Sequence, residues 1–394
     1  MRRPSLLVIF FSVFIDLIGF GIVMPLLPLY TREFGSPGYL IGLIMASFSV
    51  MQFLFAPMWG RLSDRIGRRP VILLSNAGSA IAYAMFAIAS QKGGQTGLFL
   101  ILASRIFAGL CGANLSVASA YIADVTTPEK RSKGMALIGV AFGLGFILGP
   151  AFGGLTFDHW GRQAPGWAAA AICAANTILG FFVLSESRQP NSESAAKRPR
   201  FEQWKHSLGQ PTLGTLILIY FLAIFCFASF ETTFGLLVKR LDYSPKNVSY
   251  LITYCGFITV LVQGGIGRLV KSFGERRLIP ISMVILAIGL AILPYVTSLA
   301  GILMGLCIVA VGSGVNRAPT MGLISILTPP NEQGASLGVM QSAGSLGRIL
   351  GPFLAGSLFD VSYQTPYLIC AGIALLAGLA AWAKLCRVPA PAAA

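Results

Sequence analysis

The chain has 394 residues, of which 55% are hydrophobic and only 11% are charged, with a mean hydropathy of +0.75 and a net charge of +15. Soluble domains carry about 25% charged residues, so this composition excludes an ordinary soluble protein and indicates a chain solvated by the lipid bilayer. Its apolar runs are about 20 residues long and do not alternate, which favours membrane-spanning helices over a barrel.

Twelve apolar segments follow one another along the chain, and each is predicted to be a transmembrane helix. Arg2 and Arg3 precede the first segment, but it contains Asp16 and no small-residue cleavage site, so we interpret it as a span rather than a signal peptide. The predicted fold is therefore all-α. The spans cover residues 6–30, 38–59, 70–90, 97–122, 134–157, 165–185, 213–237, 247–267, 278–297, 299–326, 335–359 and 364–385.

The basic residues are distributed unevenly between the two ends of these spans. Twenty of the 29 lysines and arginines fall at the end that holds both termini, six fall at the other end, and three lie inside spans. Cytoplasmic loops carry such an excess, so both termini are predicted to be cytoplasmic, in a bacterial inner or plasma membrane. The positive charge is thereby explained by topology, and no nucleic-acid partner is expected.

A long polar segment rich in Ser, Pro, Lys and Arg separates the sixth span from the seventh. We predict an N-terminal six-helix bundle over residues 1–185, a cytoplasmic linker over 186–212 and a C-terminal six-helix bundle over 213–394. Within the linker, Phe201 and Trp204 beside Lys205 favour a contact with the membrane surface.

Two motifs occur once in each half of the chain. Gly60–Arg69 recurs as Gly267–Arg276, and Leu148–Asp158 recurs as Leu350–Asp360, at nearly the same offset and in the same order. Such repeats indicate two parallel six-helix halves, with the substrate site between them near the middle of the membrane.

These motifs resemble those of the major facilitator superfamily. Gly60–Arg69 is similar to its cytoplasmic loop signature, and Gly145–Gly154 is similar to the signature of its antiporters. Four further segments resemble the tetracycline-efflux branch: Asp16–Gly21 with Pro25–Pro28, Arg105–Ala113, Ala120–Thr126, and Glu332–Ala335 with Gly351–Pro352. The resemblance implies a twelve-span major facilitator fold in two pseudo-symmetric halves. That branch has acids in spans three and nine, where this chain has Ala82 and no acid, which argues against tetracycline itself as substrate.

Five ionisable residues lie inside the predicted spans, where charge is costly and indicates function: Asp16, Arg105, Glu231, Arg317 and Arg348. Asp16 and Arg105 enter from opposite faces to depths of ~15 and ~12 Å, so both approach the midplane. We predict that Asp16 carries protons, with a pKa that depends on desolvation and on Arg105. The alternative is a permanent ion pair. Glu231 is a candidate second proton site, or an interfacial carboxylate in water.

The remaining intramembrane polar residues are candidates for substrate binding. Arg317 and Arg348 favour an anionic or zwitterionic substrate, because arginine binds carboxylate and phosphate bidentately; alternatively, Arg348 pairs with Glu231. The neutral candidates either bind substrate or join helix to helix. They are Gln52, Asn114, Tyr254, Asn316 and Gln341.

A third group of residues is predicted to act in gating. Gly60 begins the loop motif, and Asp64 within it opposes the basic bias, so its carboxylate is expected to face the positive end of another helix. The resemblance implies that this helix is span eleven, and that Arg68 and Asp124 complete a cluster that keeps the cytoplasmic side closed.

In span five, small residues surround a proline and predict a packing seam against span eight that moves or stays sealed during transport. These residues are Gly145, Gly149, Pro150, Gly153 and Gly154.

The leading hypothesis is a proton-coupled antiporter that exports lipophilic or amphiphilic drugs and other organic compounds, acting as a monomer by analogy with the fold. No GxxxxGK[ST] motif is present, so ATP is not expected to drive it, and neither a cofactor nor a metal is expected. The alternatives are a proton-coupled or facilitative transporter of an organic anion or metabolite, and a receptor or scaffold that has lost transport. An enzyme is the least favoured, because both histidines lie in loops.

Overall fold

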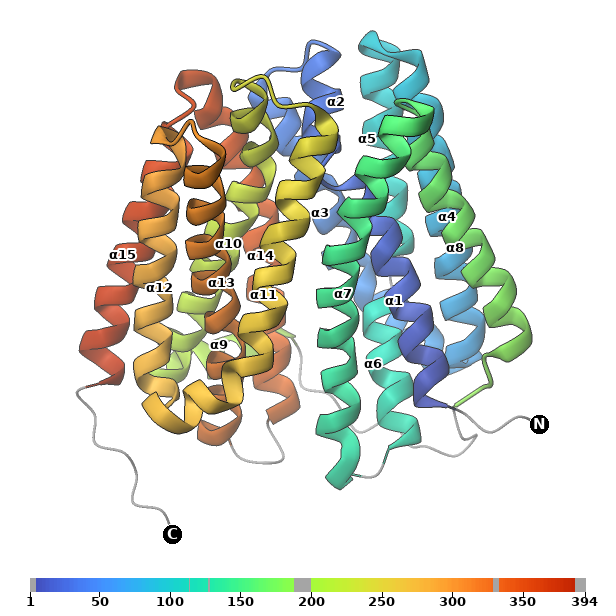
Figure 1. Ribbon diagram of the computed structural model, residues 1–394. Coiled ribbons are helices and arrows are strands. Elements are labelled where there is room, and N and C mark those ends of the chain that lie inside the picture. The colour runs from blue at the N-terminus through green and yellow to red at the C-terminus, as the bar shows by residue number, and fades with distance from the viewer. Residues whose placement is uncertain (1–4, 113, 127, 188–199, 329–332, 387–394) are drawn as a thin grey trace. The chain divides into compact units, whose positions relative to one another are not determined.

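The computed structural model describes residues 5–112, 114–126, 128–187, 200–328 and 333–386 (Figure 1). These ranges contain fifteen α-helices, one 3-10 helix and no strand. Among them, eleven segments are long and apolar enough to cross a membrane. The one predicted span not among these eleven, span eleven, corresponds to α14 (Gln333–Val361), whose 29 residues are also long enough to cross a ~30 Å core. The all-α fold with a helix at every predicted span is confirmed.

Contacts divide the chain into two compact units. Unit 1 contains Met1–Ser194 together with Val238–Gly256, and unit 2 contains Ala195–Leu237 together with Phe257–Ala394. The boundaries proposed from the sequence, at residues 185 and 213, stay a prediction.

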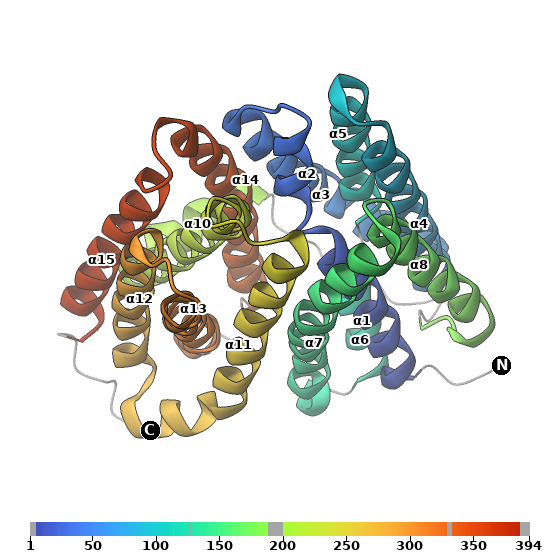
Figure 2. The same ribbon diagram turned by 45° about the horizontal axis from the view of Figure 1, so that its top comes forward.

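In unit 1, α1 lies beside α7 and α4 lies beside α8 (Figures 1 and 2). The start of α1, the end of α6 and the start of α7 lie at one end of this unit (Figure 1). Its helices are α1 (Leu6–Val23), α2 (Leu27–Glu33), α3 (Gly38–Ile66), α4 (Arg68–Lys92), α5 (Gly94–Cys111), α6 (Asn114–Val125), α7 (Pro128–Trp160) and α8 (Ala164–Val183).

Spans one and four are each made of two helices rather than the continuous helix that the hydropathy predicts. The break between α1 and α2 contains Pro25, and Pro28 lies in the first turn of α2. Proline has no amide hydrogen and fits a first turn better than a helix interior. Between α5 and α6 the helix is broken at Gly112, whose amide donates to the Gly109 carbonyl at 3.3 Å.

An apolar cluster of buried residues holds α1, α4, α6 and α7 together in unit 1. It includes Ile9, Val71, Tyr121 and Ala141, and Leu184 just after α8 joins it with only 3% of its surface exposed. Leu184 is therefore fixed against this cluster, which places the next described residues, up to Ser187, beside it.

In unit 2, α12 packs against both α13 and α15. Glycines of α14 lie against α10: a Cβ at Gly347 would be 2.9 Å from the Phe221 carbonyl oxygen, and one at Gly351 would be 2.6 Å from that of Phe225. Small residues allow this approach. The elements are α9 (Arg200–Gly209), α10 (Pro211–Lys239), α11 (Pro245–Phe273), α12 (Glu275–Ile292), η1 (Leu293–Tyr295), α13 (Leu299–Leu327), α14 and α15 (Thr365–Leu385). Two of these helices are divided between the units: α10 belongs to unit 2 up to Leu237, and α11 belongs to unit 1 up to Gly256.

The glycines of span five, on α7, do not all face span eight as the sequence suggested. Gly145, Gly149 and Gly153 lie against α1, where a Cβ would be 2.8 Å from Leu17 Cβ, 2.6 Å from Gly21 Cα and 2.6 Å from the Ile22 carbonyl oxygen, respectively. Gly154, by contrast, meets α11, the eighth span, at Ser249. The correction has a simple cause: a four-residue spacing repeats on one helix face, and the adjacent Gly154 points to another.

Candidate functional site

The turn between α3 and α4 consists of one residue. Gly67 ends α3 and precedes α4, with φ at +103°, a conformation that only glycine adopts without strain. The turn brings the last residues of α3 and the first residues of α4 together, and it leaves no side chain of its own to satisfy the free amides at the start of α4.

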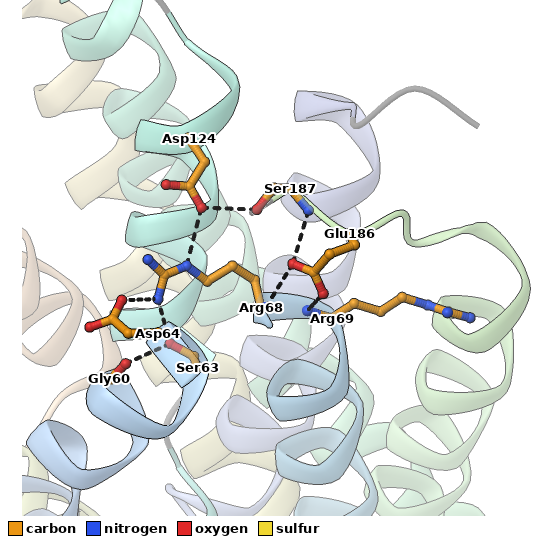
Figure 3. Close-up of polar contacts among 8 residues, drawn as sticks. All are labelled: Gly60, Ser63, Asp64, Arg68, Arg69, Asp124, Glu186 and Ser187. Atoms are coloured by element: carbon orange, nitrogen blue, oxygen red, sulfur yellow. Dashed lines mark hydrogen bonds and ion pairs between the residues drawn. The ribbon is translucent and has the colours of Figure 1, made fainter. Parts of the chain in front are cut away.

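Arg68, the first residue of α4, joins three helices (Figure 3). Its Nη1 lies 2.6 Å from Asp64 Oδ1 and donates at 2.6 Å to Ser63 Oγ, both on α3, and its Nε donates at 3.1 Å to Asp124 Oδ2 on α6. Only 10% of the Arg68 side-chain surface is exposed. Two carboxylates therefore compensate a largely buried guanidinium, which is the condition under which a buried charge is tolerated.

Glu186 supplies the cap that the turn lacks. Its Oε1 accepts from the Arg68 amide at 2.8 Å and its Oε2 accepts from the Arg69 amide at 3.1 Å, while the neighbouring Ser187 donates from Oγ to Asp124 Oδ2 at 3.1 Å (Figure 3). A carboxylate at the positive end of a helix satisfies free amides and interacts favourably with the helix dipole. The residues just after α8 are thus part of the cluster.

The structure brings together three of the predicted gating residues, Asp64, Arg68 and Asp124. Gly60 lies one turn before Asp64, and its carbonyl accepts from Ser63 Oγ at 2.8 Å. Sequence reasoning missed Glu186 and Ser187, which it assigned to the linker. The available signal was the single glycine between two helices, since such a helix start has no capping side chain of its own and leaves room for one from elsewhere in the chain.

Arg105, on α5, is buried within unit 1 with 2% of its surface exposed. Its guanidinium carbon lies 5.5 Å from the ring centroids of both Tyr83 and Phe86 on α4, and its Nη2 has no hydrogen-bond partner among the described residues. Aromatic faces stabilise a cation by their negative quadrupole. This arginine therefore keeps its place through ring contacts and retains an unused donor.

Asp16 lies half-buried on α1, with the thiol Sγ of Cys173 on α8 at 4.0 Å from its Oδ1. One turn further along α1, a Cβ at Gly19 would be 3.1 Å from the Tyr83 ring. The ring that stacks on Arg105 therefore also lies against the helix that carries Asp16.

A family model described as the Major Facilitator Superfamily matches residues 9–347 and 236–394. The chain belongs to the major facilitator superfamily. It is 32% identical to the class E tetracycline resistance protein of Escherichia coli, over 90% of this chain and 87% of that one, and 28% identical to multidrug resistance protein 2 of Bacillus subtilis strain 168, over 96% and 94%. The predicted resemblance to the tetracycline-efflux branch is confirmed, and the chain is a multi-pass membrane protein of a transporter family.

Solved structures agree with this assignment. The crystal structure of the human organic anion transporter MFSD10 (TETRAN) matches with a TM-score of 0.71 and 26% identity, covering 96% of this chain and 100% of that one. The crystal structure of the nucleoside transporter NupG matches with a TM-score of 0.75 at 15% identity over 98% and 99%, which shows the shared fold alone.

The neutral polar candidates of this major facilitator fall into two groups. Gln52 donates from Nε2 at 3.0 Å to the Gly112 carbonyl at the α5–α6 break, and Asn316 donates from Nδ2 at 3.0 Å to Ser282 Oγ on α12, so both join helices. Tyr254 and Gln341 are half-buried on α11 and α14. The side chain of Asn114 lies outside the described residues.

In unit 2 of this facilitator, Glu231, Arg317 and Arg348 are half-buried on α10, α13 and α14. Arg348 donates from Nη2 to Ser345 Oγ at 3.4 Å and lies within electrostatic range of Arg317, Glu231 and Tyr220. Two guanidinium groups and one carboxylate leave an excess of positive charge in this group.

A second set of charges in unit 1 involves α2, the end of α7 with the residues just after it, the last residue of α10 and the first turn of α11. The two carboxylate oxygens of Glu33 receive Arg162 and, at 2.7 Å, Lys239 Nζ. Asp158 Oδ2 receives Lys246 Nζ at 2.6 Å. These side chains are a quarter to two-fifths exposed, so water screens them more than it screens Arg68.

Proposed function

We propose that this protein is a proton-coupled antiporter that exports lipophilic or amphiphilic organic compounds by alternating access. In this proposal it works as a monomer in a bacterial inner or plasma membrane, with both termini in the cytoplasm and without a cofactor. The relatives named for resistance to tetracycline and to several drugs support the export of such compounds.

The observation that carries the proposal is the environment of Arg105. Arg105 is buried, has a donor with no partner among the described residues, and stacks on Tyr83 and Phe86. The Tyr83 ring also lies against α1 at Gly19, one turn from Asp16. A buried charge within a membrane span is costly, and we take this cost as a sign of function. The proposed purpose is to favour the ionised form of the Asp16 carboxylate until substrate and proton exchange there. A proton moving down a membrane potential supplies ~2.3 kcal/mol per 100 mV, which is enough to drive uphill export together with a pH gradient.

The second candidate function is transport of an organic anion. Arg348 lies within electrostatic range of both Arg317 and Glu231, and this excess of positive charge favours it; the 26% identical human structure is named as an organic anion transporter. In this alternative the carboxylate of the substrate binds in unit 2.

The test is proton and substrate flux in liposomes that contain the purified full-length chain and an internal pH dye. A panel of cationic, neutral and anionic amphiphiles is compared for wild type, Asp16→Asn and the control Asp158→Asn, whose carboxylate is exposed. We expect substrate-dependent proton movement in wild type and in the control, and its loss in Asp16→Asn. Asparagine nearly preserves the shape of the aspartate side chain, so the fold is expected to be kept. A fold defect would be seen separately, as a changed elution volume or melting temperature.

The two candidates separate on the same panel. Proton-coupled movement of cationic or neutral amphiphiles supports the drug antiporter, whereas movement of anions alone, lost in Arg348→Gln, supports the anion transporter. Substrate movement that carries no proton signal and is unchanged in Asp16→Asn would refute coupling at Asp16.

A further inference from the structure

The start of α4 has no capping side chain on the residue before it. A helix begins with amides that have no partner within the helix, and the residue before it normally supplies a side-chain oxygen. Here that residue is Gly67, which has no side chain, and its positive φ makes replacement by Asp or Ser strained. A side-chain cap for α4 can therefore come only from another part of the chain, and otherwise water must satisfy these amides.

Glu186 meets this requirement from a fixed position. Leu184, two residues earlier, is buried in the apolar cluster, and Arg69 holds the end of α8 by donating from Nη2 at 2.6 Å to the Phe181 carbonyl, with its guanidinium 5.5 Å from the Phe181 ring centroid. A Cβ at Gly67 would collide with the Glu186 carboxylate, 2.9 Å from its Cδ. The carboxylate thus lies directly over the turn.

The three carboxylates of the cluster all bind the start of α4, but Glu186 binds a different part of it from the other two. Asp64 and Asp124 receive the guanidinium of Arg68, whereas Glu186 receives the backbone amides of Arg68 and Arg69. Fixing the backbone of Arg68 fixes the origin of its side chain, and Ser187 holds the same Asp124 oxygen that Arg68 Nε contacts. Glu186 and Ser187 therefore act on both ends of the Arg68–Asp124 pair.

We propose that Glu186 is a positioning residue of the gate. By binding the first two amides of α4 it sets the position of Arg68. It thereby couples the segment just after α8, residues 184–187, to the Asp64–Arg68–Asp124 cluster. A movement of that segment would then be transmitted to the cluster. The gating part of this inference rests on the proposed transport function, whereas the positioning part does not.

The first test is hydrogen–deuterium exchange of the full-length protein in lipid nanodiscs. Glu186→Gln is compared with Glu186→Asp and with Glu275→Gln, a matched control in which the carboxylate belongs to the first turn of its own helix, α12. We expect Glu186→Gln to speed exchange roughly five- to tenfold, the worth of such a cap, at the start of α4 and also at the ends of α3 and α6. Glu186→Asp is expected to restore part of the protection, and Glu275→Gln to change α12 alone.

Exchange that increases only at the first two amides of α4, with the ends of α3 and α6 as in wild type, would reduce Glu186 to a simple helix cap and overturn the proposal. This arm requires no transport, so it decides the positioning role even if the protein proves not to be an antiporter.

The second test is kinetic. In the liposome assay Glu186→Gln is expected to lower kcat at least about threefold with KM unchanged, because a gate controls a conformational step rather than substrate contact. In the double variant with Asp124→Asn the two effects should not add, because both act through Arg68. Additive effects, or a change in KM alone, would contradict the role in gating.

Discussion

The turn between α3 and α4 and the turn between α11 and α12 are copies of one motif in which one pair of charges is reversed. Both are single glycines with positive φ, Gly67 at +103° and Gly274 at +72°. In the first copy the pair four residues apart is Asp64 and Arg68; in the second it is Lys271 and Glu275. The backbone geometry is therefore repeated, whereas the charges of this pair are reversed.

This difference separates what the fold requires from what the site requires. Two helices joined by one residue need a glycine in either copy, because the chain must reverse where an L-residue would be strained. The second copy places its own Glu275 in the first turn of α12. The first copy begins α4 with two arginines and takes its carboxylate from Glu186. The charges of the first copy therefore connect it to distant parts of the chain.

The largest effect is expected from Arg68→Ala, set against Glu275→Ala in the second copy. Removal of Arg68 leaves Asp64 and Asp124 without their shared cation, and loss of one partner of a buried pair costs about 3–5 kcal/mol. Since these carboxylates are 38% and 27% exposed, we expect about 2 kcal/mol and at least a tenfold loss of transport. Glu275→Ala should cost about 0.3–1 kcal/mol, the worth of a first-turn acid.

Unfolding in detergent and flux in liposomes measure the two effects, with Arg68→Lys as the control that keeps the charge. Equal effects of Arg68→Ala and Glu275→Ala would show that the two copies are equivalent and that the charges of the first serve topology alone.

A smaller difference is expected between Gly67→Ala and Gly274→Ala. Both substitutions place a Cβ in the left-handed region, at about 1–2 kcal/mol each. At Gly274 the added Cβ meets nothing within 4 Å, but at Gly67 it collides with the Glu186 carboxylate. We therefore expect Gly67→Ala to lower the melting temperature further and to slow transport, and the additional effect should shrink when Glu186 is also replaced by Ala. If it does not shrink, the collision with Glu186 is not its cause.

The fold was accessible from the sequence because hydropathy and helix length report burial in lipid directly. Every predicted span corresponds to a helix, yet the sequence did not reveal that spans one and four are each divided, since an apolar run continues through Pro25 and Gly112. A hydropathy average is insensitive to one residue that interrupts the backbone hydrogen bonds.

The cluster could be predicted from the sequence only in part. Asp64 was predicted because an acid in a basic loop is unusual, and its partners Arg68 and Asp124 were predicted from the family resemblance. Glu186 did not, because it stands at the edge of a polar segment where a glutamate is ordinary, and its role depends on a contact 118 residues away in sequence. Tertiary contacts of this kind have no local pattern.

The smallest effect is expected at the exposed pair of Asp158 and Lys246, which tests whether burial, rather than the mere presence of an ion pair, distinguishes the α3–α4 cluster. The two atoms are as close as those of Arg68 and Asp64, at 2.6 Å, but the side chains are 42% and 33% exposed. Water and salt screen such pairs, so Asp158→Asn should leave the melting temperature within error and transport within about twofold of wild type. A loss of stability or transport comparable to that of Arg68→Ala would mean that the proximity of charges alone predicts function in this protein. Burial would then not explain why the Asp64–Arg68–Asp124 cluster is expected to matter more than the exposed pair.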